Sequence, residues 1–189
     1  MASIILFHSV FGLRHVEFAA AERFRAAGHA VVAPDLFDGQ SADTIDRGFE
    51  LMKSIGWSRI CARAENAVSD LPADTVLAGI SMGAGVVASV WPSRPDTKGI
   101  LLLHGLAQIP ENARKSLPVQ VHVAERDQFV SADERRDWQH DAIRHGLSLE
   151  IFDYPGAGHF FTDESLQDYN AQAAAKTWAM VATFLEDVS

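Results

Sequence analysis

The chain has 189 residues, which predicts one domain, residues 1–189, with a sizeable hydrophobic core. Hydrophobic residues make up 48% of it and charged residues 22%, and these proportions exclude a disordered or fibrous protein. The net charge is −9 and no block of Lys and Arg stands out, which argues against a nucleic-acid-binding protein. The single cysteine has no Cys or His partner at metal-ligand spacing, so we expect neither a metal nor a cofactor.

The N-terminal segment MASIILFHSVFG has no basic n-region, and its apolar run covers only a few residues. It therefore fits neither a signal peptide nor a membrane span. We expect a cytoplasmic protein that is not bound to a membrane.

Short apolar runs alternate with amphipathic helical patterns along the first part of the chain. In the first helical pattern, Val16, Ala20 and Phe24 fall on one face before Gly28. Pro72 limits the last helical pattern of this part. The predicted elements are strands at residues 4–8 and 29–35 and helices at residues 14–27, 41–56 and 57–71.

The second part of the chain continues this alternation. A strand and a helix surround the serine of TVLAGISMGAGVVASVW, residues 75–91, and Pro92 ends that helix. Ser131 and Glu134 have the spacing of a capping box, which predicts the start of a further helix. The remaining predicted elements are strands at residues 98–105, 118–127 and 147–155 and helices at residues 131–146 and around Ala174, Trp178, Val181 and Leu185.

Strands that alternate with helices, with no hairpin dipeptides between them, predict the α/β class. We expect about six parallel strands in one sheet, with helices on both faces joined by right-handed crossovers. In sheets of this kind, ligands bind at the carboxyl ends of the strands. The residues that directly follow the strands are therefore the candidates for a functional site.

The pentapeptide Gly79-Ile80-Ser81-Met82-Gly83 lies at the turn from a predicted strand to a predicted helix. By itself, Gly-x-Ser-x-Gly recurs by chance too often to identify a site. The strand-to-helix context is what a nucleophile elbow requires, because small residues around the serine let strand and helix approach closely. The helix also directs its free N–H groups toward the place where negative charge would develop on an acyl substrate. We therefore interpret Ser81 as a nucleophile rather than a hydroxyl in a tight turn.

A serine nucleophile needs a histidine base that a carboxylate orients. His159 lies in the glycine-containing loop YPGAGHFF after the last strand, where it would reach the same sheet edge as Ser81. His104 ends another strand at this edge and is the second choice, with a pocket-wall or core role as its alternative. Asp127 directly follows the fifth strand and is preferred as the acid over two nearby carboxylates. The order Ser81, Asp127, His159 is the α/β-hydrolase order of nucleophile, acid and base.

With these residues in place, the sequence resembles the dienelactone hydrolase family of α/β-hydrolases nearly from end to end. LFHSVFGLRHVEFAAAERFRAAGHAVVAPDLFDG resembles the family's opening strand, loop, helix and second strand, LAGISMGAG its elbow, HVAERDQFV its acid loop and YPGAGHFF its histidine loop. The resemblance implies a minimal α/β-hydrolase fold that lacks the first two strands of the full fold. It also implies a triad of Ser81, Asp127 and His159, with an oxyanion hole formed by the backbone N–H groups of Val10 and Met82.

Several positions depart from the family's pattern. The family's namesakes have a cysteine nucleophile, a glutamate in the first loop and a serine after the histidine, where this chain has Ser81, Ser9 and Phe160. In those namesakes the positions serve cysteine activation and binding of the lactone's carboxylate. Arg47 lies near the family's carboxylate-binding arginine, and an anion contact and a solvated helix arginine are its alternative roles. The candidates for the substrate pocket are Ser9, Arg47, His104 and Phe160.

The sequence thus predicts a serine hydrolase that cleaves a small ester, thioester or lactone through an acyl-enzyme on Ser81. An acyltransferase with the same triad stays an alternative. A non-catalytic member of the fold that binds a ligand or a partner is another, because a fold alone does not guarantee activity.

The chain has no long lid insertion, which predicts a small, open pocket. The four tryptophans are expected to pack in the core rather than to form a substrate platform, except any that is exposed near the strand ends: Trp57, Trp91, Trp138 and Trp178.

Overall fold

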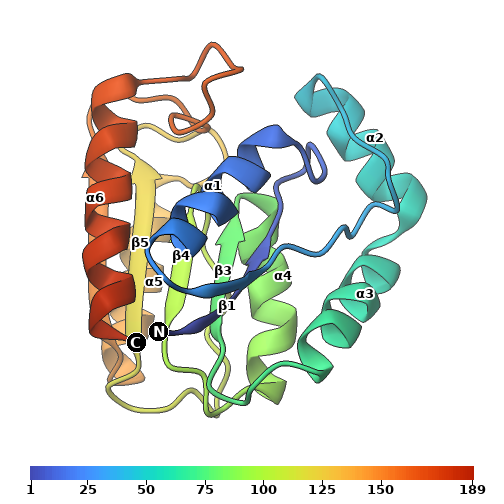
Figure 1. Ribbon diagram of the computed structural model, residues 1–189. Helices are drawn as coiled ribbons and strands as arrows, with labels where there is room; N and C mark the ends of the chain where they lie inside the picture. The colour runs from blue at the N-terminus through green and yellow to red at the C-terminus, as the bar shows by residue number, and fades with distance from the viewer.

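A computed structural model describes all residues, 1–189, and its centre is a six-stranded sheet in which neighbouring strands are parallel (Figure 1). The strand order is β2-β1-β3-β4-β5-β6, so the chain first builds one edge and then crosses to the other side of β1. This change of direction creates a topological switch point between β1 and β3. The strands are β1 (Ser3–Phe7), β2 (Ala30–Val32), β3 (Val76–Ile80), β4 (Ile100–Leu103), β5 (Pro118–Ala124) and β6 (Ser148–Tyr154).

Helices cover both faces of the sheet. Ile4 and Leu6 of β1 pack in a core with α1 and α6, whereas Ile5 and Phe7 pack in a second core with α3, α4 and α5. Side chains of a strand alternate between its two faces, and both faces are buried here, so β3 and β4 are apolar throughout. The helices are α1 (His15–Ala26), α2 (Ile45–Ile55), α3 (Trp57–Ser69), α4 (Met82–Val90), α5 (Ala132–Arg144) and α6 (Ala171–Asp187), with a 3₁₀ turn at Trp91–Ser93.

The predicted α/β class, with six parallel strands and helices on both faces, is confirmed. The start of α2 differs from the prediction, since the helix begins at Ile45 rather than at residue 41. Thr44 is its N-cap, and the Thr44 hydroxyl accepts a hydrogen bond from the backbone N–H of Arg47. At α5, the expected capping box of Ser131 and Glu134 is present.

The strand β2 is shorter than the predicted strand at residues 29–35. It forms an edge of the sheet and pairs only with β1, through Ala30–Val32. Pro34 has no N–H group to donate, which prevents the pairing from continuing. The residues of β2 are exposed or half-buried, unlike those of the central strands, so packing does not lengthen it either.

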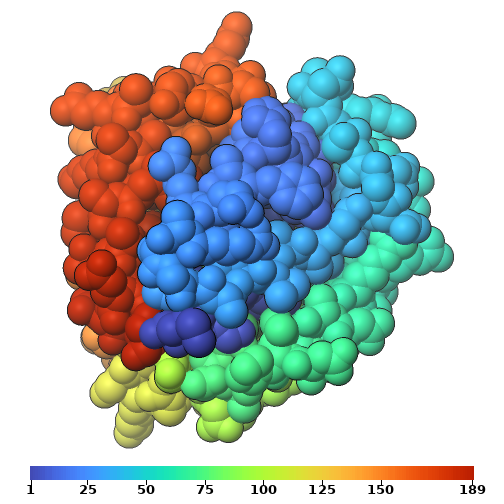
Figure 2. Space-filling view, viewed as in Figure 1, coloured from blue at the N-terminus to red at the C-terminus, as the bar shows by residue number.

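The carboxyl ends of the strands meet at the upper edge of the sheet in Figure 1. There the loops after β1, β3 and β5 gather, and α2 lies beside them. In the space-filling view, which has the same orientation, α1 covers the middle of the face turned to the viewer, between α6 and the pair α2 and α3 (Figure 2). None of the helices is both long and apolar enough to cross a membrane.

A polar cluster is buried around the middle of β5. The imidazole of His122 stacks on Phe152, with 5.1 Å between ring centroids. Its Nε2 lies 2.9 Å from Oε1 of Gln120, and its Nδ1 lies 2.7 Å from the hydroxyl of Tyr154. The Gln120 oxygen only accepts, so Nε2 carries the proton and Nδ1 accepts from Tyr154. Burial, with a smaller effect of the Lys176 charge, lowers the pKa of His122 to about 3.

Acid should therefore destabilise the fold through His122. An unfolded histidine titrates near pH 6.5 and the folded one near 3, so the unfolded chain binds the extra proton between these values. We expect the free energy of unfolding to fall by about 1 kcal/mol per pH unit from this residue as the pH drops below 6.5. Denaturant unfolding at about pH 7 and about pH 5 measures the slope. The His122→Gln variant should show a smaller slope, and an unchanged slope would contradict the assignment.

Candidate active site

Ser81 forms the turn between β3 and α4, with φ +52° and ψ −109°, a conformation that is rare outside glycine. Gly79 and Gly83 explain why this turn is so tight. A Cβ at Gly79 would overlap the carbonyl oxygen of Gly83, and a Cβ at Gly83 would overlap the carbonyl oxygen of Phe7. The two glycines thus let α4 pack directly on the ends of β3 and β1, and the turn presents Ser81 at the carboxyl edge of the sheet.

The hydroxyl of Ser81 begins a chain of two hydrogen bonds. Its Oγ lies 2.9 Å from Nε2 of His159, and Nδ1 of His159 lies 2.7 Å from Oδ2 of Asp127. A carboxylate only accepts hydrogen bonds, so Nδ1 carries the ring proton and donates a hydrogen bond to Asp127. Nε2 is then free to accept a hydrogen bond from the hydroxyl of Ser81. The side chains of His159 and Asp127 are 2% and 0% exposed, so water hardly competes for these bonds. The structure brings all three predicted residues together.

Backbone groups fix the carboxylate of Asp127. Its Oδ1 accepts hydrogen bonds from the N–H groups of Phe129, at 2.8 Å, and Val130, at 3.3 Å. Its Oδ2 faces His159. The two oxygens therefore have separate partners, and rotating the side chain would break both sets of bonds.

The loop after β6 sets the position of His159. Gly156 turns this loop with φ +71°, and the carboxylate of Asp168 accepts a hydrogen bond from the N–H of Phe160 at 3.1 Å. The rings of Phe129 and Phe160 pack edge-on against the imidazole, with 4.7 and 4.4 Å between centroids. The ring of His159 is therefore held by aromatic contacts as well as by its two hydrogen bonds.

Two backbone N–H groups are available near Ser81 for an oxyanion. Met82 is the first residue of α4, so its N–H has no partner within the helix. The N–H of Val10, in the loop after β1, donates to no other group of the protein. Val10 and Met82 line the same cavity as Ser81. Free backbone donors beside a nucleophile are the arrangement that holds a developing oxyanion.

The helix α2 contacts the Val10 loop backbone to backbone. Gly48 lies at this contact, and a Cβ there would be 2.6 Å from the carbonyl oxygen of Val10. No side chain larger than hydrogen fits unless the helix or the loop moves. The absence of a side chain at Gly48 therefore lets α2 approach the carbonyl group of Val10 closely.

A buried polar cluster joins the loop after β1 to the loop after β6. The hydroxyl of Ser9 donates to Oε1 of Glu17 at 2.8 Å, and the N–H of Arg14 donates to Oε2 at 3.1 Å. The guanidinium of Arg14 pairs with Asp163 at 2.6 Å. Burial raises the pKa of Glu17, and the Arg14 charge and the Ser9 hydrogen bond oppose this effect. Ser9, predicted as a pocket residue, thus belongs to this cluster and does not line the cavity at Ser81.

Ser81 and His159 line a cavity of about 360 Å³. Two further residues predicted for the pocket, His104 and Phe160, line it as well. Most of the remaining wall is apolar, and a large part of it comes from α2 and the start of α3. Those lining residues are Ile45, Phe49, Met52 and Trp57.

The apolar wall residues were not predicted as part of a site. Ile45, Phe49 and Met52 have the spacing of an apolar helical face, but this spacing does not indicate whether a core or a cavity covers the face. Trp57 was expected in the core, and it is instead 43% exposed at the cavity. It begins α3 just after the Gly56 turn, and this places its ring against α4 at Gly85 rather than inside the sheet cores.

His104 is the second imidazole in the cavity wall. It follows β4 with φ +60°, and its Nε2 lies 2.6 Å from the hydroxyl of Thr162. Burial, together with the nearby His159 and His122, lowers its pKa well below the ordinary value, so the ring is neutral. It has no hydrogen bond to Ser81, and the structure places it in the pocket wall.

Arg47 is not brought into the cavity. It lies two residues after Ile45 on α2, roughly 200° around the helix from that cavity-lining residue. Its side chain is 57% exposed and pairs with Glu50 at 2.8 Å. The helix therefore directs Arg47 into solvent.

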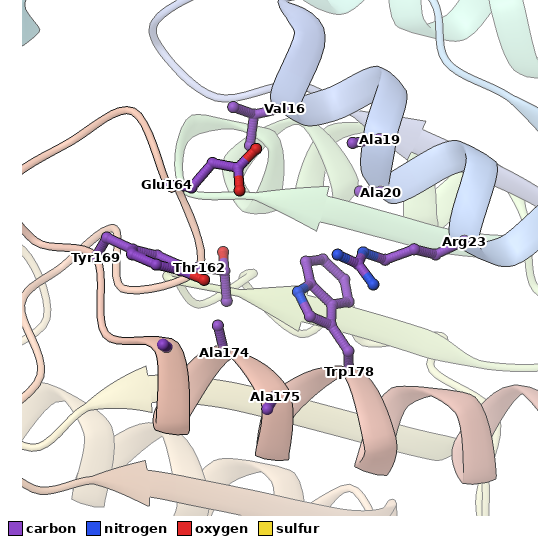
Figure 3. A pocket seen from close by; sticks show the side chains of 11 residues that line it. Val16, Ala19, Ala20, Arg23, Thr162, Glu164, Tyr169, Ala174, Ala175 and Trp178 are labelled. Atoms are coloured by element: carbon purple, nitrogen blue, oxygen red, sulfur yellow. The ribbon is translucent and has the colours of Figure 1, made fainter.

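A second hollow of about 290 Å³ lies between α1 and α6 (Figure 3). The guanidinium of Arg23 lies over the ring of Trp178, 5.4 Å from its centroid, on one side of this hollow. Glu164 and Tyr169 lie on the other side. None of the residues that line it belongs to the hydrogen-bonded chain at Ser81.

Comparisons with known proteins identify the family. The profile of the dienelactone hydrolase family matches residues 1–189. An Aquifex aeolicus protein provisionally named a carboxymethylenebutenolidase is 25% identical over 203 residues, which cover 97% of this chain and 87% of that protein. A similarly named Azospirillum brasilense protein is 26% identical over 205 residues, covering 97% of this chain and 86% of that protein.

The fold agrees with this family. The crystal structure of the dienelactone hydrolase-like promiscuous phosphotriesterase P91, from metagenomic libraries, matches with a TM-score of 0.78 at 19% identity. The match covers 100% of this chain and 87% of P91. The chain therefore belongs to the dienelactone hydrolase family, and its family and fold are those of an ester-type hydrolase.

Proposed function

We propose that the protein is a serine hydrolase that cleaves a small ester, thioester or lactone through an acyl-enzyme on Ser81. The observation that carries the proposal is the hydrogen-bonded chain from Ser81 to His159 to Asp127, with distances of 2.9 and 2.7 Å. The ester-type chemistry of the family supports it.

In the first half of the reaction, Nε2 of His159 accepts the proton of Ser81 while Oγ attacks the substrate carbonyl. The carbonyl oxygen becomes an oxyanion and accepts hydrogen bonds from the N–H groups of Val10 and Met82. Asp127 stabilises the imidazolium that forms and keeps the ring in place. His159 then donates the proton to the leaving oxygen or sulfur, and the carbonyl re-forms as an ester of Ser81.

In the second half, a water molecule takes the place of the leaving group. Nε2 of His159 accepts a proton from this water as it attacks the Ser81 ester, and the same N–H groups hold the second oxyanion. The proton returns to Oγ, and the carboxylic acid leaves. For a lactone, the leaving oxygen stays attached to the acyl group, so the product is a hydroxy acid.

Covalent labelling with a fluorophosphonate probe tests the proposal. We expect the probe to react with the native protein and to shift the mass of the peptide that contains Ser81, because this serine alone has an imidazole nitrogen within 2.9 Å. The Ser81→Ala variant should not react. Ser69, exposed at the end of α3, is a matched control, and Ser69→Ala should react like the native protein.

Equal labelling of the native protein and Ser81→Ala would overturn the nucleophile assignment. A native protein that neither reacts with the probe nor hydrolyses activated short-chain esters would instead have the alternative role, a non-catalytic protein that binds a ligand.

A further inference from the structure

The cavity at Ser81 has no cationic side chain. Its polar side chains belong to Ser81, His104 and His159, and the other lining residues are apolar or glycine. The two cations of α2, Arg47 and Lys53, are both exposed and outside the cavity. A negatively charged group in this cavity would therefore find no counter-ion.

The electrostatics of the cavity wall are unfavourable for an anion. A carboxylate that enters an apolar cavity loses its water, and this loss is compensated only by a paired charge or by several hydrogen bonds. Asp127 does not line the cavity, but its buried carboxylate lies directly behind His159, so no positive charge stands behind this part of the wall. Burial keeps His104 neutral by lowering its pKa, so it does not supply a positive charge.

The mouth of the cavity is aromatic. Phe49, Trp57 and Phe129 are 40%, 43% and 42% exposed, and all three line the cavity. The rings of Phe49 and Phe129 lie 6.0 Å apart between centroids. These side chains expose apolar surface toward the opening, and an apolar substrate group would remove that surface from water.

We propose that the enzyme selects uncharged substrates, whose group beside the reacting carbonyl packs against Phe49 and Met52 of α2, and that it rejects substrates with a carboxylate there. This inference rests on the proposed hydrolase function at Ser81. By this inference, the protein would differ in substrate class from any relative that acts on a carboxymethylene-substituted lactone, because the carboxyl group of that substituent is an anion at neutral pH.

A pair of activated esters that differ only in charge tests the inference. The two compounds are 4-nitrophenyl 4-carboxybutanoate and its primary amide, 4-nitrophenyl 4-carbamoylbutanoate, with 4-nitrophenyl butanoate as the reference ester. We expect kcat/KM for the amide to exceed that for the carboxylate by about 100-fold or more, because the buried charge is unpaired. Spontaneous hydrolysis of each ester is measured without protein and subtracted.

Each other result has a defined meaning. Similar kcat/KM values for the two compounds, or a preference for the carboxylate, would overturn the charge selection while leaving the hydrolase proposal intact. Rejection of the amide as well, with butanoate hydrolysed, would also overturn it, because charge would not be what the cavity selects. Hydrolysis of none of the three esters would remove the proposed function and, with it, this inference.

Variants on α2 locate the selection. Met52→Arg places a cation in the wall, and we expect it to raise kcat/KM for the carboxylate relative to the amide by about 10-fold or more. Met52→Gln has a long side chain without the charge and should leave that ratio low. Arg47→Gln removes a cation outside the cavity and should leave the native ratio unchanged. A large change in Arg47→Gln would overturn the inference even if Met52→Arg does not fold.

Discussion

Replacing Asp127 by Asn should reduce kcat for ester hydrolysis by about 10⁴-fold while the fold stays intact. The two oxygens of Asp127 have different partners: Oδ1 accepts from the N–H groups of Phe129 and Val130, and Oδ2 from His159. An Asn at this position keeps its one oxygen on the backbone donors, so its NH₂ group faces His159 and donates to Nδ1. The ring proton then lies on Nε2, which can no longer accept the proton of Ser81.

Steady-state hydrolysis of 4-nitrophenyl butanoate measures kcat, and thermal unfolding checks that the fold is retained. The matched control is Asp153→Asn, a change of the same kind in β6. The side chain of Asp153 is 48% exposed and pairs with Arg135 at 3.0 Å rather than with His159. The kcat of this variant should therefore stay within about twofold of the native value. Near-native turnover by Asp127→Asn would contradict the role given to this carboxylate.

The substitution Gly83→Ala should lower the free energy of unfolding by about 3 kcal/mol or more. The added Cβ would overlap the carbonyl oxygen of Phe7 and lie 3.0 Å from that of His8. Both obstacles are backbone atoms of β1 and of the loop that follows it, so no rotation of a side chain relieves the overlap. The helix α4 must therefore move away from the strand, and the packing between them is lost.

Gly85→Ala, two residues further along α4, is the matched control. Its Cβ would lie 3.3 Å from the ring of Trp57, a side chain that is 43% exposed and free to shift. The gain in helix propensity is about 1 kcal/mol, so this variant should be about as stable as the native protein or slightly more stable. Denaturant unfolding of both variants measures the difference. If Gly83→Ala is as stable as Gly85→Ala, the close approach of α4 to β1 is not what requires glycine.

The sheet and the hydrogen-bonded chain at Ser81 could be predicted because both depend on local patterns. The inner strands β1, β3 and β4 are short apolar runs, as expected for strands that are covered on both faces. The helices instead repeat their apolar residues at helical spacing. Once the strands are parallel, their carboxyl ends meet at one edge, so residues far apart in the chain, such as Ser81 and His159, are expected together. The further information needed was which serine, aspartate and histidine lie in the turn and loops that follow these strands.

The walls of the site could not be predicted in the same way. An apolar helical face such as Ile45 and Met52 has the same spacing whether a core or a cavity covers it. The position of Ser9 depends on Glu17, whose buried carboxylate takes up the Ser9 hydroxyl, and no spacing rule links the two. The direction of Arg47 depends on where α2 begins, and the Thr44 cap sets that start. These features are decided by packing between elements rather than within them.

Because of the Gly48 contact, we expect the position of α2 to affect both the width of the cavity and the position of Val10 beside Ser81. The helix α2 supplies one wall of the cavity, and at Gly48 it packs against the carbonyl group of Val10, the residue whose N–H group also faces Ser81. We expect that moving the whole helix outward to admit a bulkier acyl group would disturb the packing around Val10, whose N–H group is proposed to hold the oxyanion. Trimming a side chain such as Phe49 enlarges the cavity and leaves the backbone contact in place. Natural or engineered changes of substrate range in this protein should accumulate in the side chains of α2, while its backbone stays where Gly48 holds it.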